Sequence, residues 1–209
     1  MKLLCIGRNY GDHARELGNA VPAEPVFFLK PATALLQHGN AIRLPRFSSD
    51  VHHELEVVFR VGRTASHISS ERAWEHLDAY TLGLDLTARD VQQEQKEKGL
   101  PWEKAKAWDG SAPMSDTWTP IDPGTPPGSV AFSLERNGRV VQRGTTDDML
   151  FPVPALVAYL SRFITLEPGD LVFTGTPAGV GPLAPGDVLE GKLDGRTILT
   201  FNVEAEGER

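Results

Sequence analysis

The stretch Val51-His52-His53-Glu54-Leu55-Glu56 runs directly into the apolar segment Val57-Val58-Phe59-Arg60-Val61. This pattern predicts a strand over Glu54–Val61. Side chains alternate along a strand, so Glu54 and Glu56 point to the same face. Two neighbouring carboxylates on a buried strand repel each other and are costly to remove from water, so they need a cation beside them. A hard divalent ion bound through oxygen atoms meets that need, and a solvated strand face is the alternative.

A third carboxylate, Asp85, stands at the C-terminal end of a predicted strand, Tyr80–Leu86. Three oxygen ligands that leave positions open for water and substrate suit Mg²⁺ or Mn²⁺. We therefore expect Glu54, Glu56 and Asp85 to form one metal site.

The neighbouring histidines His52 and His53 raise the alternative of a zinc site. Adjacent residues of a strand point to opposite faces, so at most one of the two could join the carboxylates, and by parity this is His52. A single histidine among carboxylates favours zinc less than magnesium.

Two further constellations carry possible chemistry. His13 and Glu16 lie three residues apart on a predicted helix, Asp12–Leu17, where a carboxylate can orient a histidine that acts as a general base on water. A plain surface pair is the alternative. Lys106, in a Trp-flanked segment, could stabilise a developing oxyanion, and Lys104 competes for this role.

The glycine-rich segment Thr174–Gly181 could bring backbone N–H groups to an anionic ligand, or be a simple turn. It lacks the Gly-Lys-Ser/Thr ending of a phosphate-binding P-loop. The sequence contains no Gly-x-Ser-x-Gly motif, and the segment after the first predicted strand lacks Gly-x-Gly-x-x-Gly. These absences argue against an α/β-hydrolase and against a dinucleotide enzyme.

Composition narrows the class of protein. The 209 residues carry a net charge of −7 without a cluster of Lys and Arg, which argues against nucleic acid and anionic membranes as partners. Cys5 is the single cysteine, so an intrachain disulfide is excluded and a reducing compartment fits. The N-terminal apolar run is too short for a signal peptide, and no apolar stretch reaches membrane-spanning length. We expect a soluble, cytoplasmic protein.

Short strands dominate the rest of the chain and predict an α+β fold that is mostly β. Asn137-Gly138 and Asp194-Gly195 each separate two apolar runs and predict hairpins. Thr87-Ala88-Arg89-Asp90 resembles a capping box that opens a helix through Lys98. The Pro-, Gly- and Ser-rich segment Ser111–Ser129 is predicted to be a surface excursion within one domain that spans residues 1–209. Other predicted elements are the strands Leu3–Ile6, Val26–Leu29, Ala41–Leu44 and Leu171–Phe173 and the helices that follow Ser69/Ser70 and cover roughly Pro152–Phe163.

Taken together, these segments resemble the fumarylacetoacetate hydrolase family, and above all its small acylpyruvate hydrolases. The likeness runs in family order over nearly the whole chain. It is carried by Gly7-Arg8-Asn9-Tyr10 with Asp12-His13 and Glu16, Phe28-Leu29-Lys30-Pro31, His52-His53-Glu54-Leu55-Glu56, Leu84-Asp85-Leu86-Thr87-Ala88-Arg89-Asp90-Val91-Gln92, Lys98-Gly99-Leu100-Pro101-Trp102 through Lys106, and Thr174-Gly175-Thr176-Pro177 to Gly181.

The resemblance implies a mixed β-sandwich or roll with a few short helices, a homodimer, and Mg²⁺ or Mn²⁺ on Glu54, Glu56 and Asp85. It implies that His13 and Glu16 lie on a helix that orders over the substrate. Lys106, not Lys104, matches the family's catalytic lysine. The residues that match positions near the substrate are Lys30, Arg89, Gln92 and Thr176.

The implied activity is metal-dependent hydrolysis of the C–C bond of 2,4-dioxo acids, such as acetylpyruvate or fumarylpyruvate, to pyruvate and a carboxylic acid. His13 would activate the water, and Lys106 would stabilise the oxyanion. The same metal–enolate chemistry serves an oxaloacetate decarboxylase or tautomerase, or a 2-hydroxyhepta-2,4-diene-1,7-dioate isomerase, and fold alone cannot choose between them. A binding module that has lost catalysis is the non-enzymatic alternative.

Overall fold

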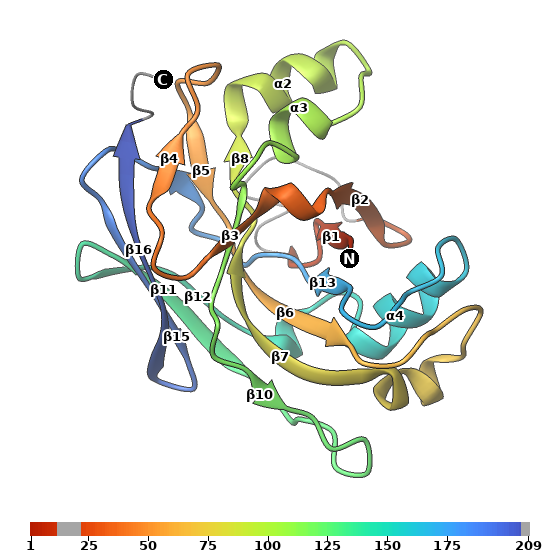
Figure 1. Cartoon of the computed structure of the whole chain (residues 1–209). Coiled ribbons are helices and arrows are strands. Elements are labelled where there is room, and N and C mark those ends of the chain that lie inside the picture. Colours follow the sequence, from red (N-terminus) through yellow and green to blue (C-terminus); the bar gives the residue numbers. More distant parts are fainter. Residues whose placement is uncertain (12–21, 206–209) are drawn as a thin grey trace.

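The computed structural model describes residues 1–11 and 22–205 of the chain. The predicted helix Asp12–Leu17, with His13 and Glu16, lies outside the described residues. Strands prevail over helices in the described part, which confirms the mostly β, α+β class (Figure 1).

A mixed sheet of eight strands forms the larger layer of the described structure. Its order is β2-β1-β13-β6-β7-β9-β3, with β10 paired to β7. Strands β6 and β7 form its long antiparallel pair and curl around one side of the molecule (Figure 1). The strands of this sheet are β1 (Leu3–Gly7), β2 (Val26–Lys30), β3 (Leu35–Gln37), β6 (Leu55–Val61), β7 (Leu77–Leu84), β9 (Ala112–Met114), β10 (Thr119–Pro120) and β13 (Leu171–Phe173).

A second sheet has the order β12-β11-β15-β16-β4. Its two hairpins turn at Asn137-Gly138 and Asp194-Gly195, as the sequence predicts, and all four residues have positive φ between 46° and 79°. Such a pair of left-handed residues gives the tight turn that matches the twist of the strands. The strands of this sheet are β4 (Ile42–Leu44), β11 (Ala131–Arg136), β12 (Arg139–Thr145), β15 (Val188–Leu193) and β16 (Arg196–Ala205).

A small third sheet joins β14 (Gly181–Pro182), β5 (Val51–His53) and β8 (Thr87–Ala88). The predicted strand over Glu54–Val61 is therefore interrupted at its first residue, because Glu54 lies between β5 and β6 and belongs to neither. The chain changes sheets at this residue, since β5 pairs with β14 and β8 whereas β6 pairs with β7 and β13.

The helices are short and cover the ends of the sheets. In Figure 1, α2 and α3 lie together at one end of the molecule, and α4 packs against the 3₁₀ helix η2. The helical segments predicted after Ser69/Ser70 and near Pro152–Phe163 are present, the first as a 3₁₀ helix. The helices are η1 (Ala32–Ala34), η2 (Ser70–His76), α2 (Arg89–Glu97), α3 (Glu103–Lys106), η3 (Thr146–Asp148) and α4 (Val153–Ser161).

The predicted capping box at the start of α2 is wrong. Thr87 belongs to β8, and its hydroxyl donates a hydrogen bond to the carbonyl oxygen of Asp85 at 3.2 Å. The carboxylate of Asp90 accepts hydrogen bonds from Ser48 and Ser49 and from the N–H of Val91 at 2.8 Å, and it does not form the reciprocal bond with Thr87 that a capping box requires. Tertiary partners therefore replaced the local hydrogen bonds that this sequence pattern offers.

The segment Ser111–Ser129 is a surface excursion only in its second half. Ser111 and Ser115 are fully buried, and β9 between them pairs with β3 and β7. The Pro and Ser content of the first half of this stretch therefore does not mark a loop: Pro113 lies opposite Leu36 of β3, and β9 pairs with β7 at Met114, opposite Gly83.

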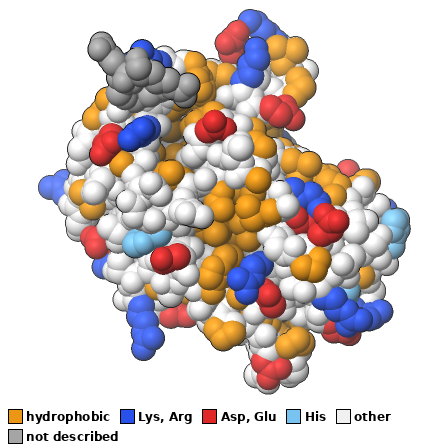
Figure 2. All heavy atoms as spheres, viewed as in Figure 1, with side chains coloured by type: hydrophobic (Ala, Val, Ile, Leu, Met, Phe, Trp, Pro, Cys, Tyr) orange, Lys and Arg blue, Asp and Glu red, His pale blue; other side chains and the backbone are white. Residues whose placement is uncertain are grey.

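The hydrophobic core fills the space between the two large sheets. Phe59 and Leu82 of the first sheet, Leu134 and Phe201 of the second, and Leu156 of α4 are buried in one cluster. Burying each such side chain stabilises the fold by roughly 1.5–3 kcal/mol. On the face shown in Figure 2, basic and acidic side chains are interspersed around a hydrophobic band. Among the described residues, no helix is long and apolar enough to span a membrane.

Candidate metal centre and active site

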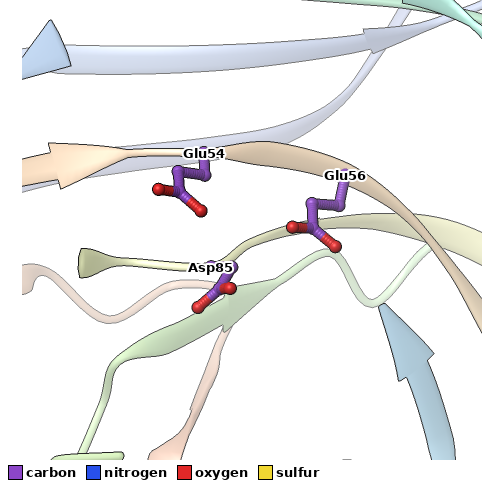
Figure 3. A group of neighbouring side chains, drawn as sticks. All are labelled: Glu54, Glu56 and Asp85. Atoms are coloured by element: carbon purple, nitrogen blue, oxygen red, sulfur yellow. The ribbon is translucent and has the colours of Figure 1, made fainter. Parts of the chain in front are cut away.

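Three buried carboxylates meet where β6 begins and β7 ends. Glu54, Glu56 and Asp85 are 5%, 1% and 1% exposed, and they offer oxygen atoms that all lie within 4.8 Å of one another. Pairing of β6 with β7 places Glu56 opposite Gly83, and the N–H of Asp85 donates to the carbonyl oxygen of Glu54 at 2.8 Å. Figure 3 shows Glu54 and Glu56 extending from one segment toward Asp85 on another. The structure therefore brings together the three acidic residues that the sequence singles out.

Three cationic side chains surround these carboxylates. Lys106 Nζ lies 2.8 Å from both Glu54 Oε2 and Asp85 Oδ2. Lys30 Nζ lies 2.7 Å from Asp85 Oδ1, and Arg89 Nη2 lies 2.5 Å from Glu54 Oε1. Buried charges are tolerated when they are paired in this way, so the cations explain how the acidic cluster folds.

Burial and neighbouring charges shift the pKa values of Glu56 and Lys106. Burial raises the pKa of Glu56 well above its usual value, and the charge of Asp85 raises it further, while a hydrogen bond from the N–H of Gly175 opposes the shift. Burial lowers the pKa of Lys106, but the charges of Asp85 and Glu54 outweigh it, so that the pKa lies above its usual value. Lys106 is thus a cation and a hydrogen-bond donor at neutral pH, and not a general base.

The donor set fits a hard divalent cation. Its ligand atoms are carboxylate oxygens, which Mg²⁺ and Mn²⁺ prefer, and an Mg²⁺ site with few carboxylates keeps positions for water or substrate. Asp85 Oδ1 has no partner with hydrogen-bond geometry in the described part, although Lys30 Nζ lies close to it. Glu54, Glu56 and Asp85 would hold such an ion.

Neither neighbouring histidine belongs to this cluster. His52 Nε2 lies 2.9 Å from Asp50 Oδ1, and His53 Nδ1 lies 3.0 Å from Gln142 Oε1. The parity argument that favoured His52 assumed one continuous strand, and the change of sheet at Glu54 removes that assumption. In the described ranges the acidic cluster contains carboxylates alone, which removes the motive for zinc.

The glycine-rich segment Thr174–Gly181 supports the cluster through its backbone. The N–H of Gly175 donates to Glu56 Oε2 at 2.8 Å, so the anion that it meets is a carboxylate of the protein. Gly175 has φ +99°, and a Cβ there would lie 2.8 Å from the Cβ of Asn9. Both the backbone conformation and the close approach therefore require glycine.

The other predicted substrate-binding residues divide into two groups. Arg89, Gln92 and Thr176 line a pocket that opens onto the carboxylates, together with Lys106. Lys30 does not line this pocket; it lies behind Asp85, where its ammonium also donates to the carbonyl oxygen of Ser111 at 2.6 Å. Lys104 is exposed, so Lys106 is the lysine that reaches the site.

Sequence reasoning missed several residues at the same pocket. Arg8 and Lys96 line it, with the aromatic rings of Phe28 and Trp102. Arg8 stands inside the quoted Gly7-Arg8-Asn9-Tyr10 motif, which was the one available signal. Lys96 is one polar residue among many on α2, and the sequence contains no signal that distinguishes it.

The raised pKa of Glu56 predicts how metal stabilisation depends on pH. Because the folded state holds this proton more tightly than the unfolded chain, the contribution of Glu56 to the stability of the metal-free protein is lost as pH rises from about 4.5, the usual pKa of a glutamate, through its pKa in the folded state. Metal binding needs the ionised carboxylate. We expect the rise in melting temperature on adding Mn²⁺ to be larger at pH 7.5 than at pH 5.5, measured by differential scanning fluorimetry. Equal rises at both pH values, or the same pH trend in Glu56→Gln, would contradict this account.

Comparison with known proteins places this site in a family. The family profile described as fumarylacetoacetate (FAA) hydrolase C-terminal matches residues 2–204. Oxaloacetate tautomerase FAHD1, mitochondrial, from Homo sapiens is 43% identical over 202 residues, which cover 97% of this chain and 91% of the relative. Oxaloacetate tautomerase YcgM from Escherichia coli is 44% identical over 199 residues, which cover 95% and 91%.

Solved structures agree with this placement. A fumarylpyruvate hydrolase from Pseudomonas aeruginosa, solved with Mn²⁺ and pyruvate, is 41% identical and matches with a TM-score of 0.92 over 99% of this chain and 90% of that one. A 2-hydroxyhepta-2,4-diene-1,7-dioate isomerase from Mycobacterium marinum is 38% identical, with a TM-score of 0.84 over 99% of this chain and 75% of that one. The chain belongs to the fumarylacetoacetate hydrolase family, as its motifs predict, and it has the mostly β domain of that family.

Proposed function

We propose that this protein is a divalent-metal-dependent oxaloacetate tautomerase, which interconverts the enol and keto forms of oxaloacetate. The observation that carries the proposal is the cluster of Glu54, Glu56 and Asp85 beside the cation Lys106, in a chain whose relatives at 43% and 44% identity are oxaloacetate tautomerases. C–C hydrolysis of an acylpyruvate, the main expectation from the sequence, becomes the second candidate.

The described residues supply binding and charge stabilisation. A divalent ion held by the three carboxylates would supply Lewis-acid polarisation of the 2-oxo group. Arg89 and Gln92 line the pocket on α2, and Arg89 Nη1 donates to Gln92 Oε1 at 2.7 Å, which fixes the guanidinium plane toward the pocket. In the proposed reaction they would orient the carboxylate next to the 2-oxo group. Lys106 would donate a hydrogen bond to the negative charge that develops when the C3 proton leaves.

The proton itself needs a base, and Lys106 cannot serve while it is charged. His13, oriented by Glu16, is the candidate that the sequence provides, and both lie outside the described residues. In a tautomerase the pair moves a proton between C3 and the solvent and activates no water. His13 thus stays the proposed base, but it transfers a proton to or from C3 and does not activate a water molecule.

Substitution of His13 separates proton transfer from metal binding. We expect His13→Ala to lower turnover by about 10²- to 10⁴-fold, the usual contribution of a general acid–base residue. Its affinity for Mn²⁺, measured by calorimetry, should stay within twofold of wild type. Undiminished turnover in His13→Ala would remove this residue from the mechanism.

The direct test of the proposed function follows enol-oxaloacetate by its ultraviolet absorbance. Purified protein with Mg²⁺, with Mn²⁺ and with chelator is compared with each metal alone, and pyruvate is assayed in parallel. Rapid, metal-dependent loss of enol without pyruvate supports the tautomerase. Pyruvate formed from oxaloacetate identifies a decarboxylase, and an unaccelerated enol decay refutes the proposal.

Hydrolysis stays a candidate because of one specific likeness. The fumarylpyruvate hydrolase solved with Mn²⁺ and pyruvate matches this fold with a TM-score of 0.92. Incubation with acetylpyruvate or fumarylpyruvate distinguishes the two activities, since only hydrolysis releases pyruvate and a second acid from these substrates. The homodimer, the single domain and the cytoplasmic location implied by the sequence stay predictions, and light scattering of the purified protein tests the first.

A further inference from the structure

Two further cations line the pocket, and within the described residues neither forms an ion pair with the carboxylate cluster. Arg8 follows β1, and Lys96 lies in the last turn of α2. Both are half-buried and line the same pocket as the three carboxylates. Across residues 1–11 and 22–205, neither side chain has an ion pair or a hydrogen bond to a side chain. Their positive charge is therefore available to an anion in the pocket.

Arg8 is held in an unusual backbone conformation. Its φ is +60°, which side chains other than glycine rarely adopt and which tends to occur where function demands it. The next residue, Asn9, is fully buried and fixes the segment, because its amide donates to the carbonyl oxygen of Thr174 at 2.8 Å and its Oδ1 accepts from the N–H of Phe151 at 2.8 Å. Arg8 is thus tied to the loop that also donates to Glu56.

Lys96 is held by an aromatic surface. Its ammonium lies 5.7 Å from the ring centre of Trp102, and that ring meets Phe28 edge-on at 6.0 Å. Lys106 lies 5.1 Å from the ring centre of the same Phe28. The two lysines therefore share one aromatic wall of the pocket, with Lys106 at the carboxylates and Lys96 farther along α2.

The pocket has more positive side chains than are needed to balance the negative charges of the three carboxylates. Glu54 and Asp85 already pair with Lys30, Lys106 and Arg89, and Glu56 accepts a hydrogen bond from the N–H of Gly175. Burial lowers the pKa of Lys96, and the positive charges of Arg89 and Arg8 lower it further, so the three cations repel one another. A divalent ion at the cluster would add to this excess, and a ligand with two negative charges compensates it better than a ligand with one.

We propose that Arg8 and Lys96 form the subsite for the distal carboxylate of a dicarboxylic 2-oxo acid, and that they select dianionic substrates over those with a neutral tail. The proposal rests on the proposed function, because the carboxylate cluster must receive the 2-oxo acid end of the same molecule. It narrows the substrate class to short 2-oxo diacids such as oxaloacetate, and it disfavours acetylpyruvate, whose tail is uncharged.

The test compares oxaloacetate with its 4-methyl ester, which has nearly the same size but lacks the distal charge. Wild type, Arg8→Gln, Lys96→Met and the double variant are assayed for enol decay with both compounds. We expect the ratio of kcat/KM for the diacid over the ester to fall about 10- to 100-fold in each single variant, since a charge-assisted hydrogen bond is lost. Lys98→Met is the matched control, because Lys98 is the exposed C-cap residue of the same helix and pairs with Glu94 at the surface. The kcat/KM ratio of this variant should stay at the wild-type value.

Ligand binding separates this proposal from the proposed function. Calorimetry on the Mn²⁺-loaded protein measures oxalate, which has no distal group, and oxaloacetate. Weaker oxaloacetate binding in Arg8→Gln and Lys96→Met, with oxalate affinity within about threefold of wild type, supports the subsite even if no substrate turns over. Equal losses for both ligands, or no loss for oxaloacetate, overturn it. Arg8→Lys and Lys96→Arg should recover part of the diacid preference, which a mere folding defect would not allow.

Discussion

Replacing Asp85 with asparagine is expected to abolish metal-dependent turnover and to weaken Mn²⁺ binding by more than about 100-fold, beyond the loss typical of an outer-shell partner. Asp85 contributes one of the three carboxylates, and its two oxygens also meet Lys30 at 2.7 Å and Lys106 at 2.8 Å. Asparagine keeps the shape of the side chain but removes its negative charge, which acts on the metal ion, on Lys30 and on Lys106. Calorimetry with Mn²⁺ and the enol-decay assay measure the two effects.

The same substitution is expected to destabilise the protein. Lys30 is fully buried, and breaking a buried ion pair by removing one partner typically costs about 3–5 kcal/mol. Relief of the repulsion between Asp85 and Glu56 offsets part of this loss. The matched control is Asp78→Asn at the exposed pair with Arg60, where we expect a change below about 1 kcal/mol. An Asp85→Asn variant that binds Mn²⁺ like wild type would refute the assignment of this cluster as the metal centre.

Lys106→Met is expected to lower turnover without weakening metal binding, unlike Asp85→Asn, which is expected to lower both. We expect kcat to fall about 10²- to 10³-fold, the usual effect of removing one donor to a developing anion. Mn²⁺ affinity should stay the same or rise, because Lys106 Nζ meets Glu54 Oε2 and Asp85 Oδ2 and competes with the metal for these oxygens.

Lys104→Met is the natural comparison, since this lysine lies on the same short helix and is exposed. It should retain wild-type kcat and wild-type metal affinity. If Lys106→Met lost metal binding together with turnover, the lysine would be a structural counter-ion of the cluster and not a participant in the reaction.

The acidic cluster could be predicted from sequence because its geometry follows from the spacing of two residues and from the pairing of two strands. Glu54 and Glu56 are two residues apart, and Asp85 follows a strand whose apolar pattern is plain. Pairing of β6 with β7 then brings these ends together. The family resemblance selected Lys106 over Lys104, and the structure shows the reason, since only Lys106 is buried against the carboxylates.

The parts that could not be predicted depend on contacts between distant segments. Asp90 accepts hydrogen bonds from Ser48 and Ser49, which are distant in sequence, and does not form the reciprocal bond with Thr87 that its local pattern favours. Arg8, at the end of β1, and Lys96, on α2, are brought to one pocket by the tertiary fold, and nothing in the sequence around Lys96 indicates this. The break between β5 and β6 at Glu54 could not be predicted from the sequence. A continuous strand and a chain that changes sheets at Glu54 both place Glu54 and Glu56 on the same side.

That break has a consequence for motion. Glu56 belongs to β6, whereas Glu54 lies between β5 and β6 and Asp85 lies between β7 and β8, where the chain passes between the large sheet and the small sheet of β5, β8 and β14. Local opening of the small sheet would displace Glu54 and Asp85 relative to Glu56, so metal dissociation and this opening are thermodynamically coupled. Amide hydrogen exchange in β5 and β8 should therefore slow when Mn²⁺ binds, while exchange in the distant hairpin of β15 and β16 should change little.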